Sequence, residues 1–212
     1  MFDFEQISTL LQAGKVKDVQ RLVQEALDAG APAKDILNQG LLRGMSAVGD
    51  KFKTGEVFIP EVLAAARAMN LGVQVLKPHL QDGSVQAAGR VAIGTVEGDL
   101  HDIGKNLVKL MMEGKGIEVV DLGANVPAAR FVEAVREQNC NLVACSALLT
   151  TTMDKMGEIV EALKEAGLRD RVTILIGGAP ITQAFCEKIG ADVYTVDAAS
   201  AAEEAVKACQ KT

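Results

Sequence analysis

The sequence has few aromatic residues and no long apolar run. Its 212 residues include no Trp, one Tyr and six Phe, so the apolar 49% consists mostly of Ala, Val, Leu and Ile. That composition suits helices packed on a parallel sheet. No apolar stretch approaches the roughly 20 residues of a membrane-spanning helix, and the first residues, MFDFEQISTLLQAGKV, lack the basic and apolar segments of a signal peptide. We therefore expect a soluble, cytoplasmic protein without a membrane partner.

The chain also lacks the features of several common ligand-binding classes. With 22 Lys and Arg against 28 Asp and Glu, its net charge of −6 does not predict a nucleic-acid partner. Neither a G-x-x-x-x-G-K-[ST] phosphate loop nor a G-x-G-x-x-G segment after a strand is present, so nucleoside triphosphates and dinucleotides are not the leading ligands. The four cysteines form no C-x-x-C pair, which predicts buried or partly buried thiols of a reducing compartment: Cys140, Cys145, Cys186 and Cys209.

Residues 1–77 are predicted to form a helical domain. Apolar residues recur at helical spacing in four segments, and the β-branched runs typical of strands are missing. The third segment lies between breaks at Asp28–Pro32 and Lys53–Glu56, and the fourth begins near Pro60. Four amphipathic segments with short connections predict a four-helix bundle. The helical pattern stops in residues 78–89, which contain Pro, Gly and Ser and are predicted to be a linker.

Residues 90–212 change to an alternation of short apolar runs and helical patterns. Such alternation predicts a parallel sheet covered by helices on both faces, here a five-stranded sheet of the Rossmann or flavodoxin-like type. The predicted strands are Val91–Ile93, Glu118–Leu122, Leu142–Cys145, Thr173–Ile176 and Val193–Thr195. The predicted helices lie near Ile103–Glu113, Ala128–Glu137, Met153–Ala166, Ile181–Lys188 and Ala199–Cys209.

One loop of the predicted sheet places a histidine where open α/β sheets bind ligands. The first strand is predicted to end at Gly94, and His101 lies in the glycine-bounded segment Gly98–Gly104 before the next helix. Asp99 precedes this histidine by two residues, and a carboxylate can hold one imidazole nitrogen while the other binds a metal. The loops after the next three strands are rich in small and hydroxyl residues, which let a large ligand approach the backbone: residues 121–127, 146–152 and 177–180.

Three short motifs in this half resemble those of cobalamin-binding domains. They are Asp99-x-His101-x-x-Gly104, Ser146-x-Leu148 and Gly177-Gly178, in that order along the chain. The surrounding residues Gly94–Asn106 are similar to the corresponding stretch of cobalamin-dependent methionine synthase and of the corrinoid proteins of methylotrophic methyltransferase systems. The helical half resembles the cap domain of the same families in residues 44–52, 55–61 and 65–69. The resemblance thus covers nearly the whole chain.

The resemblance implies that the cofactor is cobalamin or a related corrinoid, bound in the base-off/His-on form. In this form the cofactor's own benzimidazole leaves the cobalt, and His101 takes its place as the lower axial ligand. Asp99 would hold the other nitrogen of His101. Ser146 would line the cavity of the nucleotide tail and extend the hydrogen-bond chain from His101 and Asp99.

Other residues follow from the same resemblance. Gly104 would give the nucleotide tail room at the start of a helix, and Gly177 and Gly178 would let the tail base pass close to the backbone. Phe58 of the cap would lie over the upper face of the corrin. The remaining cofactor contacts that we expect are Gly98, Leu100, Asp102, Leu148 and Thr150.

The resemblance further implies a methyl carrier subunit rather than a complete enzyme. Such a protein accepts a methyl group on Co(I) from a donor-specific methyltransferase. It then passes the group from methyl-Co(III) to a second methyltransferase with a thiol or tetrahydrofolate-type acceptor. A reductive activation protein is the third expected partner. The chain contains neither a barrel-sized substrate domain nor the zinc-ligand spacing that a complete methionine synthase needs.

Three other functions stay open on the sequence alone. They are a cobalamin-dependent sensor or regulator, the cobalamin subunit of a mutase, and a flavodoxin-like module without a corrin. Regulators usually carry a DNA-binding module, and no basic helix-turn-helix segment is found in this chain. The cap segment Gly55–Pro60 favours methyl transfer over radical chemistry. The methyl donor is also open, with methylamines, methanol and methoxylated aromatics as the expected classes.

Overall fold

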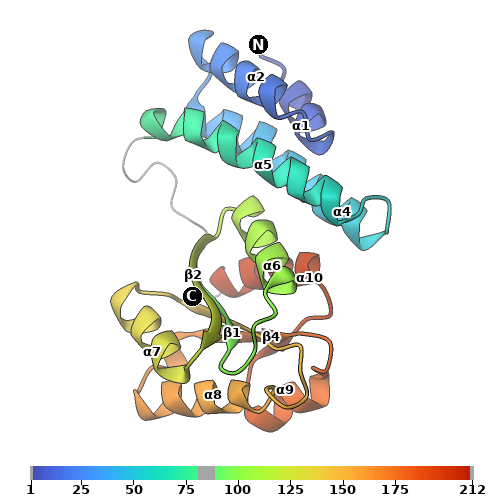
Figure 1. The fold of residues 1–212 in the computed structure, drawn as a ribbon. Helices are drawn as coiled ribbons and strands as arrows, with labels where there is room; N and C mark the ends of the chain where they lie inside the picture. The colour runs from blue at the N-terminus through green and yellow to red at the C-terminus, as the bar shows by residue number, and fades with distance from the viewer. Residues whose placement is uncertain (1, 81–88, 211–212) are drawn as a thin grey trace. The chain divides into compact units, whose positions relative to one another are not determined.

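The computed structural model describes residues 2–80 and 89–210. The chain divides into two compact units, residues 1–86 and 87–212, of which the first is helical and the second is α/β (Figure 1). Most of the predicted linker, residues 78–89, lies outside the described residues. Its first residues, Pro78 and His79, belong to a 3₁₀ turn, Lys77–His79, that directly follows the last helix of the helical unit.

The helical unit contains the predicted bundle of four helices (Figure 1). In chain order these are α1 (Phe4–Gln12), α2 (Val16–Asp28), a composite third helix, and α5 (Ile59–Leu76). The third helix runs without a break through α3 (Ala33–Asp35), η1 (Ile36–Leu42) and α4 (Arg43–Lys53). Its start after Pro32 and the start of α5 beside Pro60 agree with the predicted breaks, since proline suits the first turn of a helix.

The middle of the third helix differs from the prediction, because η1 is a seven-residue π-helix. This segment packs closely against α1 and α5. A β-carbon on Gly40 would lie 3.1 Å from Cγ2 of Ile7, and one on Gly72 would lie 2.9 Å from Cδ2 of Leu41. These contacts join residues far apart in the sequence, so the spacing of apolar residues gives no signal of the wider helical turn.

The α/β unit is an all-parallel, five-stranded sheet with strand order β2-β1-β3-β4-β5. This order is that of the flavodoxin-like fold and confirms the predicted fold class. The strands are β1 (Arg90–Val96), β2 (Glu118–Val126), β3 (Leu142–Ser146), β4 (Thr173–Gly177) and β5 (Val193–Tyr194). The helices between and after them are α6 (Ile103–Gly114), α7 (Ala128–Glu137), α8 (Lys155–Glu165), η3 (Arg169–Arg171), α9 (Gln183–Ile189) and α10 (Ala198–Cys209).

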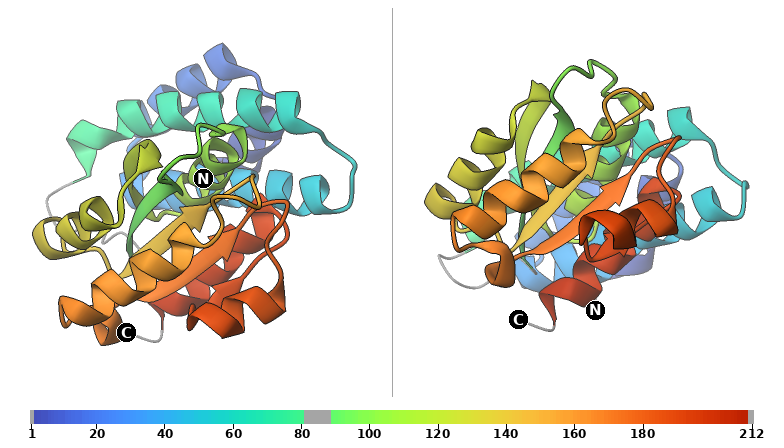
Figure 2. Two further views of the ribbon diagram at one scale, coloured as in Figure 1. Left: turned by 60° about the horizontal axis from the view of Figure 1, so that its bottom comes forward. Right: turned by 90° about the horizontal axis from the view of Figure 1, so that it is seen from below.

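Two layers of helices cover the sheet. Helices α7, α8 and α9 lie on one face, and α6 and α10 lie together on the other (Figure 2). The side chains under the first layer form a continuous core that includes Phe131, Ile159 and Phe185. Residues 91–96 of β1 are all buried, as expected for a central strand with both faces covered.

Two strands run past their predicted ends. The sequence predicted that the first strand stops at Gly94, but β1 continues through it to Val96. The ring of Phe131 packs beside this glycine, where a β-carbon would come within 2.7 Å of Cζ, so Gly94 serves packing inside the strand. β2 extends to Val126 through residues predicted as a loop, and its pairing with β1 changes register after Ile93.

The burial of the four thiols agrees with the sequence analysis. Cys140, Cys145 and Cys186 are buried and free, and Cys209 is partly exposed. Burial raises the pKa of Cys140 to about 11 and that of Cys145 to about 12, which keeps both thiols protonated. Within the described ranges, no helix has both the length and the hydropathy that crossing a bilayer requires.

Candidate functional site

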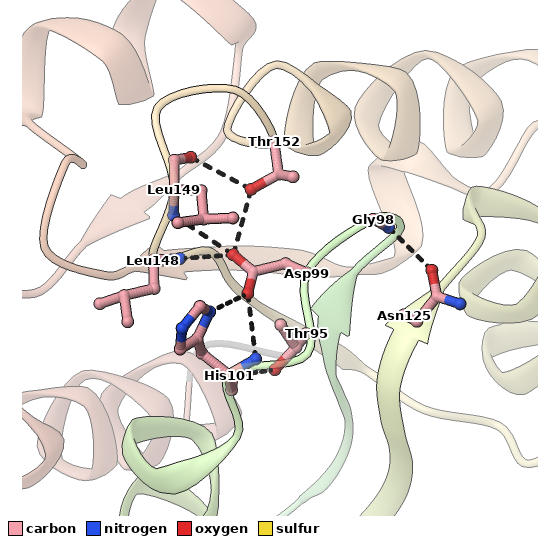
Figure 3. Close-up of polar contacts among 8 residues, drawn as sticks. All are labelled: Thr95, Gly98, Asp99, His101, Asn125, Leu148, Leu149 and Thr152. Carbon is pink, nitrogen blue, oxygen red and sulfur yellow. Dashed lines mark hydrogen bonds and ion pairs between the residues drawn. The ribbon is translucent and has the colours of Figure 1, made fainter.

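Open parallel α/β sheets bind ligands at a switch point. There, the connections from two neighbouring strands leave in opposite directions. In this sheet β1 lies between β2 and β3, so the switch point is at the carboxyl ends of β1 and β3. The loop after β1 carries Asp99 and His101, and the loop after β3 carries Leu148 (Figure 3). The motif residues therefore meet at the edge where this fold holds ligands.

The loop after β1 is held in place by two side chains outside the motif (Figure 3). The Oδ1 of Asn125 accepts a hydrogen bond from the backbone N–H of Gly98 at 2.8 Å, and the backbone N–H of Asn125 donates to the carbonyl of Asp99 at 2.9 Å. Asn125 has a φ of 56°, a left-handed conformation that asparagine tolerates better than most residues. On the other side, the buried Thr95 hydroxyl donates to the carbonyl of His101 at 2.9 Å.

The Asp99 carboxylate is fully buried and links the two loops (Figure 3). Its Oδ1 accepts from the backbone N–H of His101 at 3.0 Å and lies 2.7 Å from Nδ1 of the His101 ring. Its Oδ2 faces the loop after β3, where it accepts from the N–H groups of Leu148 at 2.8 Å and Leu149 at 3.3 Å. The Thr152 hydroxyl is a third donor to Oδ2, at 3.1 Å.

These contacts determine the charge of Asp99 and the tautomer of His101. Burial by itself would raise the pKa of Asp99, but hydrogen bonds from His101, Leu148 and Thr152 outweigh it and hold the pKa well below its usual range. Asp99 is therefore ionised at neutral pH and can only accept hydrogen bonds. We assign the ring proton of neutral His101 to Nδ1, which leaves the lone pair on Nε2 available to a metal.

The depressed pKa predicts how acid affects stability. In the folded protein the Asp99 carboxylate stays ionised below its unfolded-state value of about 3.9, so its contribution to stability is present above that pH and is lost as pH falls. Between pH 6 and pH 3, the free energy of unfolding should fall for both the wild type and the Asp99→Asn variant. We expect the fall to be about 1 kcal/mol smaller in the variant. Urea unfolding at the two pH values measures this difference.

The control for this prediction is Asp102→Asn, which changes an exposed carboxylate in the same loop. Asp102 accepts a hydrogen bond from Asn106 at 3.1 Å and does not touch Asp99 in the part of the chain that the structure describes. We expect this variant to keep the acid dependence of the wild type. An Asp99→Asn protein with the same dependence as wild type would contradict the assignment of a depressed pKa.

The His101 ring is half-exposed, with 52% of its side chain accessible, and apolar side chains surround this edge of the sheet. Large hydrophobic residues are left exposed on the loops after β1, β3 and β5 and at the start of α6: Leu100, Ile103, Leu148, Leu149 and Val196. Exposed apolar clusters of this kind mark binding surfaces. A β-carbon on Gly104 would meet no atom within 4 Å, so open space lies beside the first turn of α6. A nitrogen donor within an apolar rim, next to open space, fits a large, mostly apolar ligand that carries a metal.

The first turn of α6 is fixed to β2 by a buried cation. Lys105 is only 2% exposed, and its Nζ lies 2.6 Å from Oδ1 of Asp121 and 2.7 Å from Oδ1 of Asn106. Lys109, one turn further along, pairs with the other oxygen of Asp121 at 3.1 Å. These interactions hold the helix that begins directly after the histidine loop.

Among the described residues, no group of three or more His, Cys, Asp or Glu side chains could hold a metal ion.

The other predicted site residues lie on several different elements. Ser146 ends β3, and the hydroxyl that reaches Asp99 belongs to Thr152 instead, six residues later, so the predicted extension of the hydrogen-bond chain by Ser146 is not the one found among the described residues. Thr150 is exposed on the same loop, and Asp102 precedes the first residue of α6. Phe58, which precedes α5 in the helical unit, is 66% exposed.

The two glycines after β4 have a role within the chain itself. Gly178 has a φ of 138°, and a β-carbon there would lie 1.8 Å from the carbonyl oxygen of Ala147. A β-carbon on Gly177 would lie 3.2 Å from the carbonyl oxygen of Thr195. Glycine is therefore required at Gly178 by the neighbouring loop, whether or not a ligand also approaches it.

Sequence reasoning missed Thr95, Asn125, Thr152 and Lys105. The only available signals were weak, since a threonine at a strand end, an asparagine before a Val-Pro pair and a lysine after a glycine are all common on surfaces. Their importance comes from hydrogen bonds that the fold forms between residues 6 to 53 positions apart in the chain.

Both units of this chain match known domain families. Residues 89–207 match the family described as B12 binding domain, and residues 3–77 match a second family with the same description. The first match covers more than half of the chain, and the fold and histidine loop described above lie within it. The protein belongs to the B12-binding family.

Its relatives include several corrinoid proteins. The chain is 49% identical to the trimethylamine corrinoid protein of Methanosarcina barkeri over 82% of each chain. It is 43% identical to dimethylamine corrinoid protein 2 of Methanosarcina mazei, over 95% of this chain and 94% of that protein. These relatives confirm the resemblance to corrinoid proteins of methyltransferase systems that the sequence motifs predicted.

Solved structures agree with this result. A chain of the methanol:cobalamin methyltransferase complex from Methanosarcina barkeri superimposes with a TM-score of 0.88 at 32% identity, covering 97% of this chain and 79% of that one. A cobalamin-binding protein from Desulfitobacterium hafniense DCB-2 superimposes with a TM-score of 0.79 at 33% identity, covering 100% and 98%. The predicted fold class is thus confirmed over both units.

Proposed function

We propose that this protein is a corrinoid methyl carrier of the cytoplasm. It would accept a methyl group from a donor-specific methyltransferase and present it to a second, acceptor-side methyltransferase. The observation that carries the proposal is the half-exposed His101 ring, whose Nδ1 is held by the buried Asp99 while Nε2 is left for a metal. The relatives named as methylamine corrinoid proteins support it. Four free cysteines agree with a reducing compartment.

We infer a base-off/His-on binding mode from the geometry of the loop. Nε2 of His101 would be the lower ligand of the corrinoid cobalt, which supplies the methyl-accepting and methyl-donating centre when bound. Asp99 would orient the ring and increase its basicity, as carboxylates behind metal-bound histidines do. The apolar rim of Leu100, Ile103 and Leu148 would contact the lower face of the corrin, and the open space beside Gly104 would admit the nucleotide tail.

We further propose methylamines as the donor class. Relatives at 41–49% identity carry names of trimethylamine or dimethylamine corrinoid proteins, whereas the chain of the methanol complex is 32% identical. The partners would then be a methylamine methyltransferase, an acceptor-side methyltransferase that methylates a thiol or a tetrahydrofolate-type compound, and a reductive activation protein. The carrier itself would bind and present the cofactor rather than select the substrate.

The test is a methylation assay with the full chain reconstituted with cobalamin. Purified methyltransferases specific for trimethylamine, dimethylamine, monomethylamine and methanol are each added with their substrate under reducing conditions, and the absorption spectrum reports methylation of the cofactor. We expect one methylamine system to methylate this protein at least tenfold faster than the methanol system. A protein that stays colourless after reconstitution would overturn the cofactor assignment. A coloured protein that none of the systems methylates would overturn the carrier assignment.

A further inference from the structure

The first turn of α6 lacks the local features that usually fix where a helix begins. Asp102 holds the N-cap position, but its carboxylate accepts from the Asn106 side chain at 3.1 Å instead of capping a backbone N–H of this helix, which the structure describes in full. Gly104 is the second residue of the helix and lowers its propensity. Lys105, the third, places a cation at the positive end of the helix dipole. Contacts outside the helix must therefore hold this turn in place.

Those contacts come from β2. The buried Lys105 side chain, 2% exposed, places its Nζ 2.6 Å from Oδ1 of Asp121 and 2.7 Å from Oδ1 of Asn106. Asn106 in turn donates to the Asp102 carboxylate, so a continuous chain of polar contacts runs from β2 to the residue next to His101. Because a buried cation is costly without its partner, Lys105 ties the start of α6 to Asp121.

An irregularity in β2 places the Asp121 carboxylate. In the pairing of the two strands Ile93 lies opposite Asp121, but the next residue, Gly94, lies opposite Gly123, so Leu122 is an extra residue in β2. Gly123 has a φ of 87°, and its backbone N–H donates to Oδ1 of Asp121 at 3.0 Å. Bulges of this kind redirect side chains beside functional sites. Here the bulge accompanies a carboxylate that contacts α6.

The same strand also holds the other end of the histidine loop. A second register shift lies just beyond the first, before the pair of Val96 and Val126. Asn125 lies there, and it contacts Gly98 through its side chain and Asp99 through its backbone N–H (Figure 3). The bulged end of β2 thus attaches to the chain on both sides of His101.

We propose that Lys105 is a positioning residue for His101, acting through its ion pair with Asp121. The inference rests on the proposed function, in which Nε2 of His101 binds the corrinoid cobalt. Without the Lys105 contact, the turn that follows the histidine loses its attachment to β2, while the attachment at Asn125 stays. The end of the loop then moves more freely, and the His-on state becomes less populated.

The main variant is Lys105→Met, which keeps a long apolar side chain in the buried space and removes the charge. Asp121 still pairs with Lys109 at 3.1 Å and is 25% exposed, so its own charge is not left buried and unpaired. Lys109→Met is the first control, because it removes the other cation on Asp121 and leaves the Lys105 contact intact.

The second control is Arg169→Met, which removes a similar ion pair elsewhere. Arg169 lies 2.6 Å from Oδ1 of Asp192, and Asp192 also accepts from a backbone N–H, that of Ile174 at 2.7 Å. This pair lies at the amino ends of β4 and β5, opposite the histidine loop. It reports what loss of a buried ion pair does to the fold alone.

The first readout is hydrogen exchange of the cofactor-free protein under native conditions. Two backbone N–H groups report the end of the loop: that of His101, which donates to Asp99 at 3.0 Å, and that of Asn106, which donates to the carbonyl of Asp102 at 2.8 Å. We expect both to exchange about tenfold faster in Lys105→Met, since local opening becomes easier. Lys109→Met and Arg169→Met should exchange as wild type at these two groups.

The second readout uses protein made with ¹⁵N-histidine, reconstituted with cobalamin and reduced to cobalt(II). In electron paramagnetic resonance, an axial ¹⁵N from His101 splits the cobalt lines into doublets, whereas the ¹⁴N of the cofactor's own base gives triplets. We expect Lys105→Met to lower the ratio of His-on to His-off protein about fivefold, less than the full effect of a hydrogen bond to a charged group, because only part of it reaches His101. Both controls should keep the wild-type ratio.

The outcomes separate this inference from the proposed function. If wild type shows no doublet, the His101 ligand assignment fails, and with it the proposed binding mode. If wild type shows the doublet and Lys105→Met keeps its ratio, the role of Lys105 is overturned. It is also overturned if either control lowers the ratio as much, or if the ratio falls without faster exchange at the two N–H groups.

A double variant keeps the test decisive if Lys105→Met does not fold. Lys105→Met combined with Asp121→Asn removes both charges of the pair, and replacing a whole buried ion pair is often neutral for stability. This protein also lacks the ionic attachment of α6 to β2. It should show the same fall in the His-on ratio and the same faster exchange, and wild-type values of both would overturn the proposal.

Discussion

The His101→Ala protein should still bind cobalamin but should lose the protein's nitrogen ligand to cobalt. The His101 side chain is half-exposed, so its removal should change the free energy of unfolding by less than about 1 kcal/mol. Asp99 keeps its four other donors. Methyl transfer should slow by more than the roughly 10–100-fold that removal of an outer partner of a metal ligand costs, because here the ligand itself is absent.

The measurement is electron paramagnetic resonance of the cobalt(II) form made with ¹⁵N-histidine, together with the rate of methylation. The doublet from histidine nitrogen should disappear in His101→Ala. The matched control is His79→Ala, which removes the other histidine of the chain, in the turn after α5. That variant should keep both the doublet and the rate. A doublet that persists in His101→Ala would rule out this histidine as the axial ligand.

Alanine at Gly178 and alanine at Gly104 should have opposite effects on the stability of the cofactor-free protein. A β-carbon at Gly178 would lie 1.8 Å from the carbonyl oxygen of Ala147, on a backbone with φ of 138°. We expect a loss of at least about 4 kcal/mol in the free energy of unfolding, at the upper end of single substitutions. Gly104 lies in the first turn of α6, where the new methyl group meets nothing within 4 Å, so alanine should stabilise by about 0.5 kcal/mol.

The effect of Gly104→Ala on cobalamin affinity should be opposite in sign to its effect on stability. If the nucleotide tail enters the space beside Gly104, the stabilised Gly104→Ala protein should bind cobalamin about tenfold more weakly, since 1.4 kcal/mol of steric cost corresponds to that factor. Urea unfolding and cobalamin titration measure the two effects. Gly167→Ala is the control for backbone strain alone, with φ of 68° and no neighbour within 4 Å, and should cost about 1 kcal/mol. If Gly104→Ala binds cobalamin with unchanged affinity, the nucleotide tail does not enter the space beside Gly104.

The sequence was a good guide to what local patterns encode. Helical spacing identified the four helices of the bundle, and short apolar runs located the five parallel strands. The histidine loop could be recognised because its residues are adjacent in the chain. Interactions over long distances could not be predicted. Gly94 looked like the end of a strand because nothing in its neighbourhood indicates that Phe131 packs against it, 37 residues further along.

The same limit explains why Thr152 was not among the predicted residues of the candidate site. Ser146 and Thr152 both follow the third strand, and both could in principle reach Asp99. The choice depends on the path of the loop, which turns the N–H groups of Leu148 and Leu149 toward the carboxylate and brings Thr152 with them. Residue type and spacing do not report that path, whereas the ring contact between Asp99 and His101 follows from two residues of separation.

The shared Asp99 carboxylate has a consequence for how this region tolerates sequence change. His101, Asp99 and Thr152 act on one another through a single buried charge, so their substitutions should not be additive, although residues 99 and 152 are far apart in the chain. The effect on stability of a substitution at residue 152 then depends on which amino acid is present at residue 99. The region should therefore show epistasis, with the three positions evolving as one unit and the surrounding apolar residues varying independently.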